Sequence, residues 1–157
     1  MKRLLTGLFA VGSLVVLLVA VTAWAKPGRE HDHKGGKTIT VIEHATTDAT
    51  TDTGADGDSA GDILTFANDL FDKTDTHKVG TDQGYCIRTV VGVSYECNFT
   101  TILHGGSIVV EGPFYDAKGS VLAITGGTGR YRKARGSIKL SARENGTKFA
   151  FVFHIVR

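Results

Sequence analysis

The chain has 157 residues, enough for one domain, and its twenty glycines and two prolines favour an all-β protein with many turns. The formal net charge is only +2, and no concentrated basic face is evident, so a nucleic-acid partner is not expected. No set of metal ligands or phosphate loop emerges from residue spacing, so no cofactor is expected.

Residues 1–25 have the pattern of a targeting segment. Lys2 and Arg3 form a basic start, Leu4 to Ala20 is apolar, and Ala23-Trp24-Ala25 is a small-x-small cleavage pattern. We expect a cleaved signal peptide and a secreted domain with no membrane contact after its removal. The alternative is an uncleaved membrane anchor with the domain outside, because the apolar span is long.

Residues 26–37 are polar and rich in glycine, which is typical of a flexible tether. His31 and His33 could bind a metal ion, but a lone pair of histidines in a tether is interpreted as solvated. The folded domain is therefore expected to span residues 38–157.

The first strand is predicted over Thr38 to Ala45. Glu43 lies on the same face as Ile39, Val41 and Ala45, because alternate residues of a strand share a face. Two interpretations stay open: a surface strand whose other face is inside, or a desolvated acid with a raised pKa.

Residues 46–62 are rich in Thr, Asp and Gly and are predicted to form a solvated loop, because the aspartates lack the spacing of an EF-hand. Residues 63–71 are predicted to form a strand followed by a turn. Asn68-Asp69 can bond to its own backbone and reverse the chain there.

Two strands, residues 80–91 and 93–104, are predicted to form a hairpin that turns at Val91-Gly92. This register places Cys86 directly opposite Cys97 on the same face. In an exported chain we expect these cysteines to form a disulfide. The alternative is a free Cys86 thiol inside the cavity.

The stretch from Glu111 to Gly136 opens with Gly112-Pro113, a pair that is expected to end a strand. It then contains a short apolar strand, Val121 to Ile124, followed by the glycines of Gly126-Gly127-Thr128-Gly129. A phosphate-binding loop would need a helix directly after these glycines, and the next residues have no apolar helical period. The glycines are therefore predicted to form a corner between two strands.

The last predicted hairpin joins residues 136–142 to residues 147–156 around Glu144-Asn145-Gly146, with Asn-Gly as the preferred two-residue turn. The final strand is apolar on nearly both faces, as expected if its outer face packs against another subunit. With about eight strands and no convincing helix, the predicted fold is a closed, antiparallel, eight-stranded β-barrel with a ligand-sized interior.

The segment GPFYDAKGSVLAITGGTGRYRKARG resembles the central signature of the allene oxide cyclase and dirigent barrel families. LAITGG resembles the cyclases and GGTGRYRKARG resembles the dirigent proteins. The resemblance implies the same closed barrel, assembled as a homotrimer, around a small-molecule cavity.

The resemblance also implies site residues. In the cyclases a glutamate, an asparagine that holds a water and a cavity cysteine are implicated, and these match Glu43, Asn68 and Cys86. In the dirigent proteins a first-strand acid and an arginine are implicated, and these match Glu43 and Arg135. We expect a barrel that binds a small apolar or phenolic metabolite, as an isomerase of the cyclase type or a stereochemical guide. The alternative is a noncatalytic ligand-binding or cell-envelope protein.

Overall fold

The computed structural model describes residues 36–156, so the expected signal peptide and the two histidines of the tether lie outside the described residues. The elements are β1 Lys37–His44, β2 Ala49–Thr51, β3 Ile63–Asp72, β4 Lys78–Val90, β5 Ser94–Leu103, β6 Gly106–Tyr115, β7 Ser120–Gly127, η1 Gly129–Tyr131, β8 Arg135–Arg143, η2 Glu144–Gly146 and β9 Lys148–Val156. Between residues 36 and 156, no helix has the length and apolarity needed to cross a membrane.

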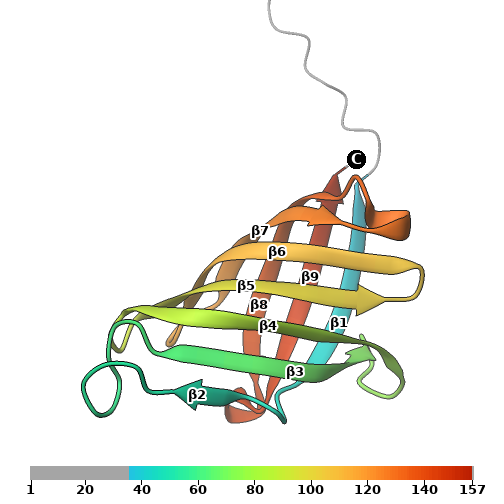
Figure 1. The fold of residues 1–157 in the computed structure, drawn as a ribbon. Coiled ribbons are helices and arrows are strands. Elements are labelled where there is room, and N and C mark those ends of the chain that lie inside the picture. The colour runs from blue at the N-terminus through green and yellow to red at the C-terminus, as the bar shows by residue number, and fades with distance from the viewer. Residues whose placement is uncertain (1–35, 157) are drawn as a thin grey trace, which may run out of the picture. The chain divides into compact units, whose positions relative to one another are not determined.

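The strands form one closed antiparallel barrel (Figure 1). From β3 to β9, each strand pairs with the next one along the chain, and β9 then pairs with β1. A pairing between β1 and β3 closes the sheet on itself, which leaves few unpaired backbone groups at an edge. The predicted fold class is confirmed.

The first strand position around the barrel, which we call the first stave, is occupied by two separate strands, β1 and β2. Val41 to His44 of β1 pair with Asp69 to Asp72 of β3, whereas β2 pairs with Ile63 to Thr65 further along the same strand. Residues 45–48 leave the hydrogen-bond ladder between these pairings. The nine strand segments of the described chain therefore make an eight-stave barrel, and the prediction of loop over residues 49–51 was wrong.

The barrel core follows the period of two that a half-buried strand requires. On β9, Phe151, Phe153 and Ile155 are buried, while His154 and Val156 between and beyond them are exposed. The other strands add fully buried aliphatic side chains, which are Leu70, Ile108, Val110, Leu122 and Ile138. Alternate positions thus place an apolar face inside the barrel.

The glycine-rich segment forms the predicted corner. Gly126 and Gly127 end β7, and η1 follows directly. Gly129 has a φ of 54°, and a Cβ atom at this position would clash with the backbone carbonyl oxygen of Gly105. Glycine is therefore required both by the left-handed backbone and by the close approach of the β5–β6 turn.

Three local predictions need correction. Asn68 lies in the middle of β3, so Asn68-Asp69 does not reverse the chain. Strand β6 continues through Gly112 and Pro113 instead of ending there. The last hairpin turns through the three residues of η2, with positive φ at Glu144 and Asn145, and not through a two-residue Asn-Gly turn.

A buried arginine fastens the loop between β2 and β3 to the barrel. Arg88 is 8% exposed; its Nε lies 2.6 Å from Asp58 Oδ1, and its Nη1 donates to both carboxylate oxygens of Asp116 at 2.9 and 2.8 Å. Its guanidinium also covers the ring of Tyr95 at 3.6 Å. Within the same loop, Asp62 accepts hydrogen bonds from two backbone N–H groups. Asp58 thus holds the loop against the barrel, and Asp62 orders the loop internally. We interpret the loop as structural.

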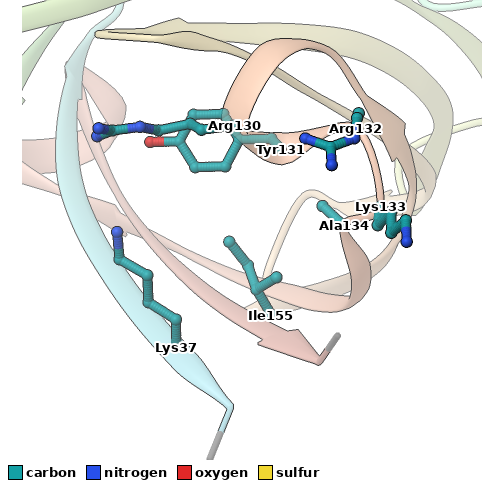
Figure 2. A pocket seen from close by; sticks show the side chains of 7 residues that line it. All are labelled: Lys37, Arg130, Tyr131, Arg132, Lys133, Ala134 and Ile155. Carbon is teal, nitrogen blue, oxygen red and sulfur yellow. The ribbon is translucent and has the colours of Figure 1, made fainter.

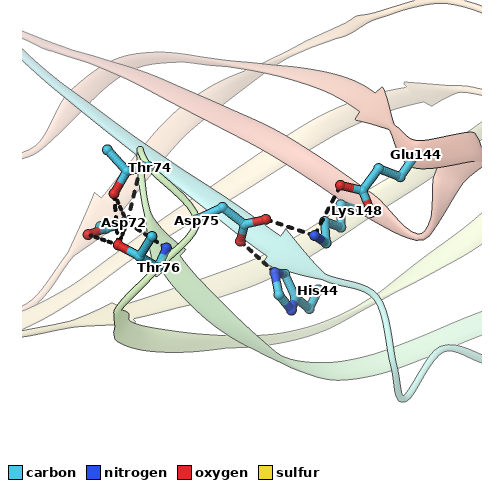
Figure 3. A network of polar contacts seen from close by, with 7 residues as sticks. All are labelled: His44, Asp72, Thr74, Asp75, Thr76, Glu144 and Lys148. Atoms are coloured by element: carbon cyan, nitrogen blue, oxygen red, sulfur yellow. Dashed lines mark hydrogen bonds and ion pairs between the residues drawn. The ribbon is translucent and has the colours of Figure 1, made fainter.

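A second polar network fastens the loop between β3 and β4 across the closing strands (Figure 3). Asp75 Oδ1 lies 2.6 Å from His44 Nε2 of β1, and Asp75 Oδ2 accepts a hydrogen bond from Lys148 Nζ of β9 at 2.8 Å. Both partners hold the pKa of Asp75 below its usual range, Lys148 more strongly than His44. The network thus links the β3–β4 loop to β1 and β9, near the pairing of β1 with β3 that closes the barrel.

Candidate functional site

The candidate site lies at the break between β1 and β2, where a side chain replaces the missing backbone pairing. Asn68 of β3 is 1% exposed, and its Oδ1 accepts hydrogen bonds from Thr46 N–H, Thr47 N–H and Thr47 Oγ1, each at 3.0 Å. Its Nδ2 donates to Glu43 Oε1 and to Asp48 Oδ1, both at 2.8 Å. The amide therefore uses both of its hydrogen-bonding ends.

Glu43 occupies the inward face of β1, two residues before the break. Its side chain is 5% exposed, and it lies on the same face as the buried Val41. Asn68 fixes the position of one carboxyl oxygen through the Nδ2 contact. Of the two interpretations left open by the sequence, the buried acid is correct.

Asp82 of β4 places a second carboxyl beside Glu43. It is 1% exposed and pairs across the ladder with Asn68 of β3 and Thr101 of β5, and neither of its carboxyl oxygens accepts a hydrogen bond from the described residues. Burial and repulsion from the Glu43 carboxylate both favour a proton on Asp82.

Burial is the main cause of the unusual acidity of this pair. Desolvation raises the pKa of Glu43 to about 7, although the hydrogen bond from Asn68 opposes this effect. Desolvation, together with repulsion from Glu43, raises the pKa of Asp82 to about 9. At neutral pH, Asp82 is therefore the protonated member, and Glu43 can take up or release a proton with little cost.

Glu43 also lines a small cavity with aromatic walls. The lining includes Glu43, Asp48, Leu64, Cys86 and Leu140 and five phenylalanines, which are Phe66, Phe99, Phe114, Phe149 and Phe151. The phenylalanine rings pack on one another, with centroids 5.7 Å apart for Phe66 and Phe99 and 5.8 Å apart for Phe114 and Phe149. The site thus combines two carboxyl groups with aromatic surfaces.

The cavity is smaller than the sequence predicted. Its volume is about 40 Å³, whereas an apolar cavity that takes up benzene measures about 150 Å³. The interior of an eight-stranded barrel is just wide enough to be filled by its own side chains or to hold one small ligand, and here large aromatic side chains occupy it. A ligand-sized interior therefore requires side chains near Glu43 to move.

The two cysteines form the predicted disulfide in the wall of this cavity. Cys86 and Cys97 are direct cross-strand partners, with Cα atoms 4.0 Å apart, and the chain contains no other cysteine. The alternative of a free thiol at Cys86 is wrong. Cys86 contributes a disulfide sulfur to the cavity wall and no nucleophile.

Arg135 is not brought to this site. It is exposed at the start of β8, where it pairs with Val156, and its Nη1 donates to the backbone oxygen of Ala134 at 2.7 Å. Glu43 pairs with Phe149, at the other end of β9. Since seven residues of strand separate these two positions on β9, they lie roughly 20 Å apart. The structure brings together Glu43 and Asn68 and leaves Arg135 outside.

Two acidic members of the site were missed by the sequence analysis. Asp82 lies four residues before Cys86, so the alternation of the strand places both on the inner face. The sequence alone could therefore have indicated that Asp82 points into the barrel. Asp48 belongs to the broken part of the first stave, where no periodicity exists, and its contact with Asn68 depends on the tertiary fold.

These features define a class of protein: a closed antiparallel barrel with a coupled pair of buried carboxyls beside an aromatic cavity. Residues 40–156 match the family model described as allene oxide cyclase. The match covers most of the chain, and the chain belongs to the allene oxide cyclase family.

Solved structures with the same fold carry several different activities. A pyocyanin demethylase is 28% identical, with a TM-score of 0.65 over 74% of this chain and 100% of that chain. A pterocarpan synthase dirigent protein is 13% identical, with a TM-score of 0.63 over 88% of this chain and 99% of that chain. An exo-specific intermolecular Diels-Alderase is 17% identical, with a TM-score of 0.61 over 78% and 99%. The fold alone therefore does not select one reaction.

Proposed function

We propose that this protein binds a small, flat, apolar or phenolic metabolite against Glu43 and catalyses its isomerisation or cyclisation by proton transfer. The observation that carries this proposal is the Glu43–Asp82 pair, two buried carboxyls with raised pKa values, of which Glu43 lines an aromatic cavity. An ionisable pair of this kind is costly to bury and is typical of a site that moves protons.

The proposed reaction needs no second substrate. Glu43 removes a proton from one atom of the ligand and returns it to another atom, so that the product is an isomer of the substrate. Asp82, protonated at neutral pH, adds no negative charge beside the Glu43 carboxylate. Asn68 keeps the carboxylate in one orientation through its Nδ2 contact.

The aromatic walls suit a ligand that develops positive charge. The faces of aromatic rings attract cations, and an adjacent carboxylate stabilises them further. Phe99 and Phe151 lie deep in the barrel with centroids 5.6 Å apart, whereas Phe66, Phe114 and Phe149 are only partly buried. The partly buried rings are the ones that would rotate to admit a ligand.

Binding can be tested through the titration of Glu43. The purified protein would be labelled at its glutamate carboxyl carbons, and NMR spectra would be recorded from pH 5 to pH 9 with and without pyocyanin, a monolignol phenol or an unsaturated fatty acid. We expect an apolar ligand in the cavity to shift the Glu43 titration. Glu43→Gln assigns the signal, and Glu96→Gln, at an exposed site on β5, serves as the matched control.

Turnover then separates catalysis from binding. Once a ligand is found, Glu43→Gln should bind it but lose conversion by about 100-fold or more, as expected for removal of a general base. Conversion that continues unchanged in Glu43→Gln would exclude Glu43 from the mechanism.

A second candidate, a noncatalytic ligand-binding or envelope protein, is favoured by the filled interior of about 40 Å³. It predicts a ligand that is recovered chemically unchanged. Chromatography of the ligand before and after incubation with the protein distinguishes the candidates, because a catalyst would release an isomer of the same mass but different retention.

We also propose that the protein is exported. The Cys86–Cys97 disulfide supports this, because such bonds persist in oxidising compartments. Cell fractionation, with the mass of the mature N-terminus, tests the proposal. A reduced, unprocessed chain in the cytoplasm would contradict it.

A further inference from the structure

A second hollow lies at the other end of the barrel from the aromatic cavity (Figure 2). We call it the basic hollow; it is lined by Lys37 of β1, Ile155 of β9 and the segment Arg130 to Ala134. Lys37 is six residues before Glu43 on the same strand, which corresponds to roughly 20 Å. The basic hollow is therefore separate from the candidate catalytic site.

The polar side chains of the basic hollow are mostly cations. Four are present: Lys37 and Arg130 on one side in Figure 2, and Arg132 and Lys133 on the other. No carboxylate lines the hollow, and within residues 36–156 none of these four cations forms an ion pair. Their charges are thus not neutralised by the described part of the protein.

The backbone that carries three of these cations is held in place before any ligand arrives. Arg130 N–H donates to the Gly105 carbonyl at 2.9 Å, and Ala134 N–H donates to the Tyr131 carbonyl at 2.7 Å. The Tyr131 side chain is part of the hydrophobic core, so it anchors the centre of the segment. A fixed backbone reduces the entropy lost when a ligand binds.

The other lining side chains add an apolar surface. Ala134 and Ile155 are both nearly fully buried and lie between the two groups of cations in Figure 2. A ligand that fits this arrangement has an anionic group for the cations and an uncharged organic part for the apolar surface. Guanidinium groups match phosphate oxygens through paired hydrogen bonds, and lysine adds a point charge.

We propose that the basic hollow binds the phosphate group of an organic phosphate ester. The phosphate could belong to a free metabolite or to a phospholipid head group. The second source is favoured if the apolar N-terminal stretch is retained as an anchor, because the chain enters the barrel at Lys37, in the lining of the hollow.

The test compares two triple variants with the same change in charge. Arg130→Gln/Arg132→Gln/Lys133→Gln removes cations from the hollow, whereas Lys73→Gln/Lys139→Gln/Arg143→Gln removes exposed cations elsewhere. Binding of glycerol 3-phosphate is measured by calorimetry. Binding to vesicles is measured by flotation, using phosphatidylcholine with and without phosphatidylglycerol, for the full chain at physiological salt.

We expect the first triple variant to bind at least about tenfold more weakly than the wild type and the control to change by less than about threefold. Loss of glycerol 3-phosphate binding identifies a free ester as the source, and loss of vesicle binding alone identifies a lipid head group. Equal losses in both triple variants, or a wild type that binds neither probe, would overturn the proposal. Circular dichroism verifies that both variants are folded.

Discussion

The two ends of this barrel use charge in opposite ways. At the break in the first stave, Glu43 and Asp82 are buried, coupled and shifted toward the protonated form. In the basic hollow, Arg130, Arg132 and Lys133 are exposed to solvent. At the acidic end, burial makes the charged forms costly in free energy and brings the pKa values closer to neutral pH, which suits proton transfer. At the basic end the cations keep their charge and can only attract anions.

The largest expected effect is at the acidic end, in Asn68→Ala. This change leaves the Thr46 and Thr47 N–H groups without their acceptor and Glu43 without its donor, so the free energy of unfolding should fall by about 3 kcal/mol or more. Chemical unfolding measures the loss. Gln83→Ala, an exposed change on β4, is the control and should alter stability by less than about 0.5 kcal/mol. A loss no larger than in the control would mean that the break does not depend on Asn68.

The wall of the aromatic cavity should be nearly as sensitive. Cys86 and Cys97 are separated by 11 residues, and opening a loop of this length should reduce the free energy of unfolding by about 3 kcal/mol. The double variant Cys86→Ala/Cys97→Ala would be compared with the wild type in guanidinium, with and without reductant. Reductant should destabilise the wild type and leave the variant unchanged; an equal response in both would exclude the disulfide as the cause.

The coupled acids should make stability depend on pH. Both folded pKa values lie above the ordinary values of 4.5 and 3.8, so the folded state binds more protons than the unfolded state over the window from about pH 4 to pH 9. The free energy of unfolding should therefore fall as the pH rises through this window, because the protons that stabilise the folded state are lost.

The variant Asp82→Asn sharpens this prediction. It removes the group with the larger rise in pKa, so the slope of stability against pH should become shallower. Unfolding at pH 5 and pH 9 measures the slope, with Glu96→Gln as a control that keeps it. A wild-type slope in Asp82→Asn would show that the pKa of Asp82 is not raised in the folded protein.

The smallest effect is expected at the basic end. Arg130→Gln/Arg132→Gln/Lys133→Gln should change the free energy of unfolding by less than about 0.5 kcal/mol, because these side chains are exposed and form no ion pair among the described residues. Urea unfolding provides the measurement. A loss above about 1 kcal/mol would assign these cations a structural role and weaken the contrast between the two ends.

Much of the barrel could be predicted from alternation and turns. The pairing of Cys86 with Cys97 and the corner at Gly129 follow from a period of two and from backbone sterics. Alternation also placed Glu43 on the face of Val41 but left open whether that face points inward. The homotrimer and the cleavage after residue 25 stay predictions.

The rest depended on contacts between distant segments. Asn68 looks like a turn residue because its amide can bond to the nearby backbone, yet in the fold that amide bonds across to residues 43–48. The volume of the interior could not be predicted either, since it depends on how the phenylalanine rings pack on one another. Arg135 matched a family motif, but its position on β8 places it away from Glu43.

The interrupted first stave has a consequence for how such a barrel can diversify. A continuous cylinder of hydrogen bonds offers no place to insert or delete residues without shifting a register. Residues 45–48 lie outside every register and still contact the buried acid through Asn68. Changes in the length of this segment can therefore alter access to Glu43 while every strand keeps its partner.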